Sequence, residues 1–401
     1  MKKNDFLRTW IELDKKALVQ NIGQFLKFIP VRTRLMAVVK SNAYGHGLAQ
    51  VAKQLAELGV KNNELGVHNS KFIIHNSRLW FGVDSIVEAL RLREEGIKNS
   101  ILVLGSTLPG RFKEAEENNI ILTVSNFESL GALKKLKNPP EFHIKIDTGM
   151  YRQGFLPEQI QKLLKLIKLY KLAPEGIYTH FASAKDRGYP TYTFEQLRKF
   201  KQAIKEFERA GFRKLIKHAA ASGGTILFPS SHLDMVRIGI GLYGYWPAPE
   251  TEKTFRFQGN PKSQSPNSKL SLKPVLTWKT IVGEVKEIPK GSHIGYDFTE
   301  RINRKTKIAV LPIGYWHGYD RGLSSIGEVL LRGRRRKILG RVSMDMIVVD
   351  VTDKPSVKVG NEAVLLGKQG KDAIWADEIA LKIGTSAYEV LTRINPLIER
   401  N

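Results

Sequence analysis

The sequence contains no cysteine, and this absence excludes several kinds of chemistry. A chain without cysteine has no disulfide, no thiolate nucleophile and no cysteine ligand for a metal, so any catalytic base or nucleophile must be another residue. Long apolar runs are also missing, since none approaches the ~20 residues needed to span a bilayer. Residues 1–5 lead straight into mixed charge without a secretory apolar stretch, and we therefore expect a cytoplasmic protein with no membrane partner.

Acidic residues are scarce relative to basic ones, with 39 Asp and Glu against 64 Lys and Arg and a formal net charge of +25. Such an excess suggests a nucleic acid or an acidic surface as a partner. The lysines, however, are spread along amphipathic stretches such as 163–168, where they solvate outer helix faces. The one dense cluster, 332–337, lies between two strand-like alternations and indicates an exposed hairpin. We therefore do not expect nucleic acid to be a partner.

Short apolar runs alternate with helical periods through the first part of the chain, which is the rhythm of βαβ units. A first strand is expected at 9–13, and helices are expected at 47–58, 85–95, 157–170 and 193–210. Further strands are predicted at 35–39, 79–83, 101–104, 120–124, 142–146, 176–179, 215–217 and 235–236. Eight such units in about 240 residues favour a closed α/β TIM barrel over an open doubly wound sheet. We assign this barrel to residues 1–246.

A different pattern follows the barrel. Residues 247–274 are rich in proline, glycine, serine and lysine, which is typical of a linker. Short alternating strands separated by glycine turns come next, over 278–366. We therefore predict a mainly antiparallel β domain at 275–401, with residues 1–12 as a candidate extra strand that pairs with it. The polar, asparagine-rich insertion 61–76 is predicted to be a surface loop without assigned chemistry.

Polar side chains converge at one end of the predicted barrel. The active site of a TIM barrel lies at the carboxyl ends of its strands. The polar residues that the sequence places there are Lys40, Arg152, His180, Ser222 and Arg237. A lysine that directly follows a buried apolar strand is partly desolvated, which suits it to bond with an aldehyde cofactor. Extension of the Lys40 side chain into solvent is the equally weighted alternative. We predict no metal site.

The run that contains this lysine closely resembles the pyridoxal-phosphate attachment motif of bacterial alanine racemases. It reads Ala37-Val38-Val39-Lys40-Ser41-Asn42-Ala43-Tyr44-Gly45-His46-Gly47. Further matches to that family lie at 81–83, 145–152, 178–183, 236–240 and 340–345. The resemblance covers nearly the whole chain and implies a fold-type III isomerase that uses pyridoxal 5'-phosphate. The implied reaction is the interconversion of L-alanine and D-alanine by two-base proton exchange, which supplies D-alanine for peptidoglycan.

The family resemblance implies four catalytic residues. Lys40 is implied to hold the cofactor as a Schiff base and to act as the base on the D-substrate face, and Tyr296 to act on the opposite face. Racemisation requires two such bases, because one removes a proton while the other supplies one from behind. Arg237 matches the arginine beside the cofactor's pyridine nitrogen, where a permanent cation keeps that nitrogen unprotonated and suppresses transamination. His180 matches the histidine that links this arginine to the tyrosine.

The same resemblance implies which residues bind the cofactor. The set is Lys40, Tyr44, Arg152, His180, Ser222, Arg237, Gly239 and Ile240. Tyr44 and Ser222 match hydroxyl donors to the phosphate, while Gly239 and Ile240 offer backbone N–H groups to it. Arg152 matches the arginine that holds the cofactor's phenolic oxygen and approaches the substrate carboxylate.

A small amino-acid substrate and a homodimer with shared active sites are also implied. The substrate-binding residues are Arg152, Met344, Asp345 and Tyr315. The backbone N–H of Met344 is implied to come from the partner subunit. Lys145 matches a lysine that is often carbamylated in this family, where the added negative charge orients the arginine equivalent to Arg152.

The chain departs from the family at Pro396. Many relatives have a tyrosine there, eight residues after the one equivalent to Tyr388, so a contact with the cofactor phosphate or the site entrance is lost or supplied from elsewhere. Two alternatives stay open, a racemase of broader specificity for serine or lysine and a non-catalytic pyridoxal-phosphate-binding protein. The second is less favoured, because such proteins lack the β domain that carries Tyr296. The sequence does not separate substrates well, since one methylene is worth only about 1–3 kcal/mol of discrimination.

Overall fold

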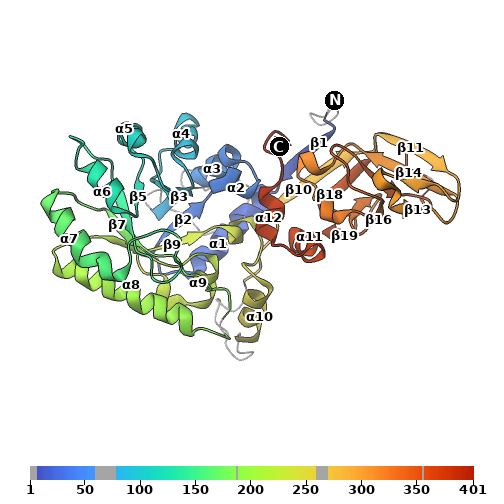
Figure 1. The fold of residues 1–401 in the computed structure, drawn as a ribbon. Helices are drawn as coiled ribbons and strands as arrows, with labels where there is room; N and C mark the ends of the chain where they lie inside the picture. Colours follow the sequence, from blue (N-terminus) through green and yellow to red (C-terminus); the bar gives the residue numbers. More distant parts are fainter. Residues whose placement is uncertain (1–6, 59–77, 187, 259–269, 355) are drawn as a thin grey trace. The chain divides into compact units, whose positions relative to one another are not determined.

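The structure, a computed structural model, describes residues 7–58, 78–186, 188–258, 270–354 and 356–401 (Figure 1). The described residues pack into two compact units. The barrel unit comprises residues 18–43 and 48–273, and the sheet unit comprises residues 1–17, 44–47 and 274–401. The insertion predicted as a surface loop, 61–76, lies outside the described residues. Within the described ranges, no helix is both long and apolar enough to cross a membrane.

The barrel unit is built on eight parallel strands in the order β4-β3-β2-β9-β8-β7-β6-β5. Their bounds are β2 (Arg34–Val38), β3 (Leu79–Val83), β4 (Ile101–Val103), β5 (Leu122–Val124), β6 (Phe142–Lys145), β7 (Gly176–Tyr178), β8 (Ile216–His218) and β9 (Met235–Ile238). The two ends of this order meet where Leu102 forms a parallel bridge to Ile121. The Val103 N–H also donates to the Ile121 carbonyl over 2.9 Å. The predicted α/β barrel is therefore confirmed.

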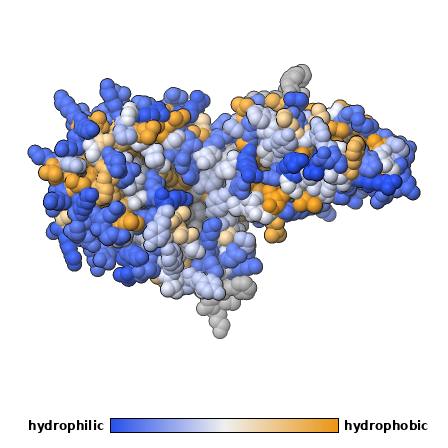
Figure 2. Space-filling view, in the orientation of Figure 1, coloured by the Kyte–Doolittle hydropathy of each residue, from blue (hydrophilic) through white to orange (hydrophobic). Residues whose placement is uncertain are grey.

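Helices connect the barrel strands and turn an apolar face towards them. Their bounds are α1 (Lys15–Phe28), α3 (Leu48–Glu57), α4 (Ile86–Glu94), α5 (Phe112–Glu117), α6 (Phe127–Leu133), α7 (Ile160–Leu169), α8 (Thr191–Arg209) and α9 (Ser222–Leu227). In α7 the side chains of Leu163 and Ile167 are buried, whereas Lys162, Lys165 and Lys168 are exposed. Figure 2 shows a largely hydrophilic surface over α7 and α8. The lysines thus lie on the outer helix faces, as the periodicity predicts.

Part of the predicted linker 247–274 is helical. Helix α10 spans Pro249–Gln258, with proline at its first position, two acidic residues in its first turn and Arg256 in its last turn. These residues favour a helix at those positions. The ring of Phe255 packs 5.6 Å from that of Phe28, between ring centroids, and the chain stays in the barrel unit through residue 273. The segment predicted as a linker thus contains a helix, which the contact with Phe28 packs within the barrel unit.

The sheet unit holds a ten-stranded sheet in the order β11-β14-β17-β16-β15-β18-β10-β1-β20, with β19 paired to β18. The bounds are β1 (Thr9–Leu13), β10 (Leu276–Ile281), β11 (Glu284–Ile288), β14 (Thr306–Leu311), β15 (Glu328–Leu331), β16 (Arg334–Leu339), β17 (Ile347–Asp350), β18 (Glu362–Gln369), β19 (Asp372–Ile374) and β20 (Glu399–Arg400). The small pair β12 (His293–Ile294) and β13 (Glu300–Arg301) and the helices α11 (Ala376–Ile383) and α12 (Ala387–Thr392) complete it. Only the β1–β20 pairing is parallel among the pairs described in this sheet. The predicted mainly antiparallel fold is confirmed.

The first strand of the chain belongs to this sheet. β1 runs antiparallel to β10, with Thr9 opposite Thr280 and Leu13 opposite Leu276. The Thr280 hydroxyl also donates to the Arg8 carbonyl over 2.8 Å. β1 is thereby tied to a strand that lies beyond the barrel and more than 260 positions later in the sequence.

The arginine-rich run 332–337 forms the β15–β16 hairpin. Its two turn residues, Arg332 and Gly333, have φ values of 56° and 73°, which suit a two-residue hairpin loop. The expectation that the whole run is exposed was wrong for two residues. Arg336 is buried and pairs with Asp353, while Arg335 enters a cluster of ionic contacts.

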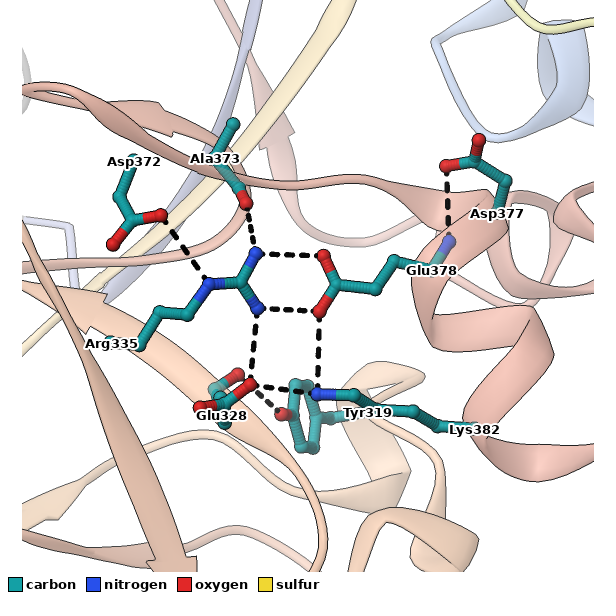
Figure 3. Close-up of polar contacts among 8 residues, drawn as sticks. All are labelled: Tyr319, Glu328, Arg335, Asp372, Ala373, Asp377, Glu378 and Lys382. Atoms are coloured by element: carbon teal, nitrogen blue, oxygen red, sulfur yellow. Dashed lines mark hydrogen bonds and ion pairs between the residues drawn. The ribbon is translucent and has the colours of Figure 1, made fainter.

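Figure 3 shows this cluster, in which the Arg335 guanidinium faces three carboxylates. It bonds both oxygens of Glu378 and contacts Glu328 and Asp372. The Lys382 ammonium bridges Glu328 and Glu378 from the other side. Hydrogen bonds from Arg335 and Lys382 lower the pKa of the Glu378 carboxyl. The cluster ties the hairpin to α11, since Glu378 and Lys382 lie on that helix.

Candidate active site

Lys40 lies two residues after the end of β2, at the carboxyl end of the barrel. Its Nζ is 2.9 Å from Oδ1 of Asp84, which directly follows β3. The Lys40 side chain is 36% exposed, so it is neither enclosed nor fully extended into water. The ion pair orients the amine at the rim of the barrel, next to the end of the neighbouring strand.

The chain takes an unusual course immediately after Lys40. Ser41, Asn42 and Ala43 all have φ values between 53° and 55°, in the left-handed region. This conformation costs about 1–2 kcal/mol per residue for L-amino acids. The Glu88 carboxylate stabilises it, because Oε1 accepts from the backbone N–H groups of Ser41 (2.6 Å) and Asn42 (3.3 Å). Glu88 therefore fixes the turn that follows the lysine, a role that the sequence did not reveal.

Arg237, in β9, is buried with 3% of its surface exposed. Its Nη2 donates to the carbonyls of Thr179 and Ala219, both over 2.8 Å, and lies 3.2 Å from Nδ1 of His180. Burial lowers the pKa of Arg237 to about 10, which leaves it a cation at neutral pH. Burial and the neighbouring Arg237 charge hold the pKa of His180 well below its usual value. His180 is therefore a neutral ring that accepts from the arginine through Nδ1.

Three cationic side chains, Arg152, Arg237 and Lys40, lie close enough to Lys145 to act on its charge. The pKa of Lys145 is lowered to about 8, mainly by burial and then by the charges of Arg152, Arg237 and Lys40. Among the described residues, its ammonium donates to the Gln153 Oε1 over 2.9 Å. Clustered cations that repel one another are stabilised by an anionic ligand. The rim therefore fits a ligand that carries phosphate or carboxylate groups.

The loop that carries Arg152 is shaped by Asp147. The Asp147 Oδ1 accepts from the backbone N–H groups of Gly149, Met150 and Tyr151, and its Oδ2 accepts from the backbone N–H of Arg152 over 2.9 Å. These backbone bonds lower the pKa of Asp147 even though burial raises it. The carboxylate is thus occupied with the backbone, and the exposed Arg152 side chain remains available to a ligand.

Ser222, Gly239 and Ile240 come together beyond β8 and β9. The buried Ser222 Oγ accepts from the Gly239 N–H over 3.1 Å and from the Gly241 N–H over 3.4 Å. A Cβ on Gly223 would lie 2.4 Å from the Ala184 carbonyl oxygen, so glycine is required for this close approach. Ile240 begins a 3-10 turn at the same place. Backbone amides and a hydroxyl are the groups that hold phosphates, and this cradle fits one.

The other predicted residues lie in the sheet unit. Tyr44 packs against Tyr388, with ring centroids 6.0 Å apart. Tyr315 and Met344 are neighbours, because the Tyr315 and Trp316 N–H groups donate to the carbonyls of Ser343 and Met344 over 3.0 Å. Burial lowers the pKa of His317, and the charge of Asp345 partly opposes this effect. Tyr315 also lines a surface hollow with Asp320, Arg321 and Arg393.

Tyr296 is exposed to 70% in a 3-10 turn, Tyr296–Phe298. Gly295 precedes it with a φ of 76°, and Asp297 forms an ion pair of 2.8 Å with Arg341. This ion pair joins the Tyr296 turn to the 340–345 segment that also carries Met344. The Tyr296 side chain is therefore exposed to solvent, on a turn that the Asp297–Arg341 ion pair stabilises.

The structure thus groups the predicted residues in two sets. The barrel unit brings together Lys40, Lys145, Arg152, His180, Ser222, Arg237, Gly239 and Ile240, and the sheet unit carries Tyr44, Tyr296, Tyr315, Met344 and Asp345. Sequence reasoning missed Glu88, His218, Tyr178 and Tyr388. Tyr178 stacks on His218 with centroids 4.6 Å apart. A polar residue inside a barrel strand is the signal that would have pointed to His218.

Comparison with known proteins identifies matches over both units. Residues 13–247 match the family "Alanine racemase, N-terminal domain", and residues 275–401 match "Alanine racemase, C-terminal domain". The chain is 37% identical over 398 residues to an alanine racemase of Leptospira interrogans, covering 99% of this chain and 96% of that protein. It is 39% identical over 397 residues to the alanine racemase of Halothermothrix orenii, with 98% and 96% covered.

Solved structures show the same similarity. The alanine racemase from Bacillus anthracis with bound L-Ala-P superposes with a TM-score of 0.85 at 34% identity, over 98% of this chain and 95% of that chain. The alanine racemase from Streptomyces coelicolor A3(2) gives a TM-score of 0.83 at 31% identity, over 100% and 99%. The similarity therefore extends across both units in sequence and in fold.

Proposed function

Because the chain belongs to the alanine racemase family, a family of pyridoxal-phosphate-dependent isomerases, we propose that Lys40 and Tyr296 exchange the substrate's alpha proton. The reaction itself, interconversion of L-alanine and D-alanine, follows from the family. The observation that supports the assignment of Lys40 is its place at the carboxyl end of the barrel, where the charges of Lys40, Arg152 and Arg237 act on Lys145. That charge suits an anionic cofactor and an amino-acid carboxylate.

We assign cofactor binding to the residues of the rim and the cradle. Lys40 would hold the cofactor through its amine, Ser222 and the amides of Gly239 and Ile240 would hold the phosphate, and Arg152 would donate to the phenolic oxygen. When bound, the cofactor withdraws electrons from the substrate carbon that loses its proton. Tyr44 adds a hydroxyl to the phosphate.

Two bases on opposite faces of the substrate carry the exchange. A Lys40 amine removes or returns the proton on the D face, and the Tyr296 phenol does so on the L face. Arg152 holds the substrate carboxylate, while the Met344 N–H, Asp345 and Tyr315 surround it. Neutral His180 connects the Arg237 cation to the tyrosine. Carbamylation of Lys145 stays a prediction, as does the cytoplasmic role in supplying D-alanine for peptidoglycan.

A chiral assay tests this function. The purified protein with added pyridoxal 5'-phosphate should convert L-alanine to D-alanine, and the reverse, until the two are equal. A panel with L-serine and L-lysine decides between an alanine enzyme and one of broader specificity. A protein that binds the cofactor but converts none of the panel would be a non-catalytic binding protein, contrary to the proposal.

Arg237→Glu is expected to change the outcome of the reaction as well as its rate. A carboxylate beside the pyridine nitrogen favours its protonation, which strengthens the electron sink and promotes transamination. Racemisation should fall by roughly a hundredfold or more, as for loss of a preorganised charge. Pyruvate formed per D-alanine, measured enzymatically, should rise. Arg237→Lys, which keeps the cation, is the control and should form less pyruvate than Arg237→Glu. An unchanged pyruvate fraction in Arg237→Glu would contradict the electronic role.

We further propose that the chain forms a homodimer with shared active sites. The sheet unit exposes large apolar side chains close in sequence to its assigned site residues. Those exposed to more than half are Tyr296, Phe298, Trp316, Met344 and Met346. Such groups mark interaction surfaces in proteins that are otherwise polar outside. In the proposed dimer, a partner subunit covers these side chains, and residues of both subunits together form each active site.

A further inference from the structure

A chain of polar side chains runs through the interior of the barrel. Arg237 Nη1 lies 2.9 Å from His218 Nδ1, and His218 Nε2 lies 2.9 Å from His143 Nδ1. His143 Nε2 lies 3.3 Å from Oε2 of Glu175. Both histidines have no exposed surface. Barrel interiors are normally filled with branched apolar side chains, so two imidazoles in this position need an explanation.

The polar chain formed by Arg237, His218, His143 and Glu175 crosses the barrel from one end to the other. β9, β8, β7 and β6 are consecutive neighbours in the sheet. His218 is the last residue of β8, near the site, whereas Glu175 immediately precedes β7 at the opposite, amino end. The Glu175 side chain is 29% exposed and so reaches solvent. The polar chain therefore links the proposed cofactor arginine to a carboxylate at the far end of the barrel.

The donor and acceptor roles of these groups allow the hydrogen bonds of the polar chain to run in one direction, from Arg237 to Glu175. A guanidinium only donates, so His218 Nδ1 must accept and His218 must carry its proton on Nε2. That proton is donated to His143 Nδ1, so His143 carries its own proton on Nε2 and donates it to the Glu175 carboxylate. Burial lowers the pKa of both histidines, which keeps both rings neutral and able to donate and accept once each. Each ring nitrogen of the two histidines thereby has a hydrogen-bond partner.

The surroundings hold the two rings in place. A Cβ on Gly176 would lie 2.4 Å from His143 Cε1, so the strand leaves room for this ring only because glycine is there. The Tyr178 ring stacks on His218 at an interplanar angle of 10°. Burying polar rings costs free energy that well-packed apolar residues would not. A role beyond packing accounts for such an arrangement.

We propose that Glu175 and His143 are positioning residues that, through His218, aim the Arg237 guanidinium and balance its buried charge. The Glu175 anion at one end and the Arg237 cation at the other polarise the two neutral rings in the same sense, which strengthens each bond of the chain. Rotation of the guanidinium would break the His218 bond and leave a buried acceptor unpaired. This inference rests on the proposed role of Arg237 and names the residues that support it.

The test compares Glu175→Ala with Glu141→Ala in the holoenzyme. Glu141 is an exposed carboxylate just before β6 at the same end of the barrel, and its charge acts on Glu175, but it is not part of the polar chain. The first measurement is 15N NMR of ring-labelled histidines, assigned with His218→Gln and His143→Gln. In Glu175→Ala, Arg237 still fixes both tautomers, but the His143 Nε2–H loses its acceptor, so the His143 ring signals should shift and, through the weakened bond between the rings, the His218 signals as well. They should stay as in the wild type in Glu141→Ala. Glu175→Gln, whose amide oxygen still accepts, should restore the wild-type signals.

The second measurement is pyruvate formed per D-alanine. Glu175→Ala should raise this ratio by about 2- to 30-fold, the range expected for changes along a coupled network, with the alanine KM nearly unchanged. Unaltered histidine signals in Glu175→Ala would overturn the inference, and so would altered signals with an unaltered ratio. If Arg237→Glu itself leaves the ratio unchanged, the proposed role of Arg237 fails instead. The two failures are distinct because the NMR signals report the polar chain without reference to catalysis.

Discussion

Lys40→Ala is expected to lose at least about a thousandfold of the racemase activity, because it removes a base and the bond to the cofactor together. No neighbouring group offers the same two functions. Asp84, the ion-pair partner of Lys40, has no amine, and Lys145 is engaged with Gln153. The measurement is D-alanine formed from L-alanine with added pyridoxal 5'-phosphate. Lys162→Ala, at an exposed lysine on α7, is the control and should keep wild-type activity.

The covalent bond itself is tested by reduction. Borohydride treatment of the holoenzyme should fix the cofactor irreversibly, and peptide mapping should find it on the peptide that contains Lys40. Lys145 is the informative competitor, since its lowered pKa of about 8 also favours a neutral amine. Label on the Lys145 peptide, or full activity in Lys40→Ala, would show that the attachment site is misassigned.

The barrel strands were predictable because parallel strands are buried on both faces. Such strands read as continuous apolar runs, and the run 35–39 corresponds within a residue to β2. The prediction was less accurate where the strand is short. Of the run 120–124, only 122–124 is strand, since residue 121 joins its neighbour through an isolated bridge. Apolar periodicity therefore located the strands but not their ends.

Local conformations fixed by distant partners were not predictable. The left-handed turn after Lys40 depends on the Glu88 carboxylate, which is more than 40 residues away. Burial of Arg336 places its guanidinium against Asp353, which is 17 residues away. In both cases a tertiary contact overrides the local sequence preference.

The candidate site divides in the same way. Lys40, His180 and Arg237 followed from the rule that barrel sites lie at strand ends, and the structure places them there. Tyr296 and Met344 came only from the family resemblance, because nothing in an exposed turn distinguishes a catalytic tyrosine from any other. The polar chain from Arg237 to Glu175 could not be predicted from the sequence. Its members are separated by 19, 75 and 32 positions, and only the closed barrel makes them neighbours.

Tyr296→Phe is the counterpart of Lys40→Ala in the shared-site proposal. It keeps the ring and removes only the hydroxyl, so the exposed turn should fold as before. Racemisation should fall by about 10²- to 10⁴-fold, the range for loss of a general acid or base. Each pure variant then forms a dimer in which both sites lack one of the two bases, and both preparations should be nearly inactive.

Mixing the two inactive variants distinguishes a shared site from a site within one subunit. After co-refolding, about half of the dimers should contain one subunit of each kind. If the Tyr296 of one subunit serves the Lys40 of the other, each mixed dimer has one site with both bases and one with neither. The mixture should then recover roughly a quarter of the wild-type activity, since half of the dimers have half of their sites intact. If both bases come from the same subunit, every site still lacks one of them and no activity returns. Native mass spectrometry of the mixture must show the mixed dimer, because only then does a lack of recovery place Tyr296 and Lys40 in one chain.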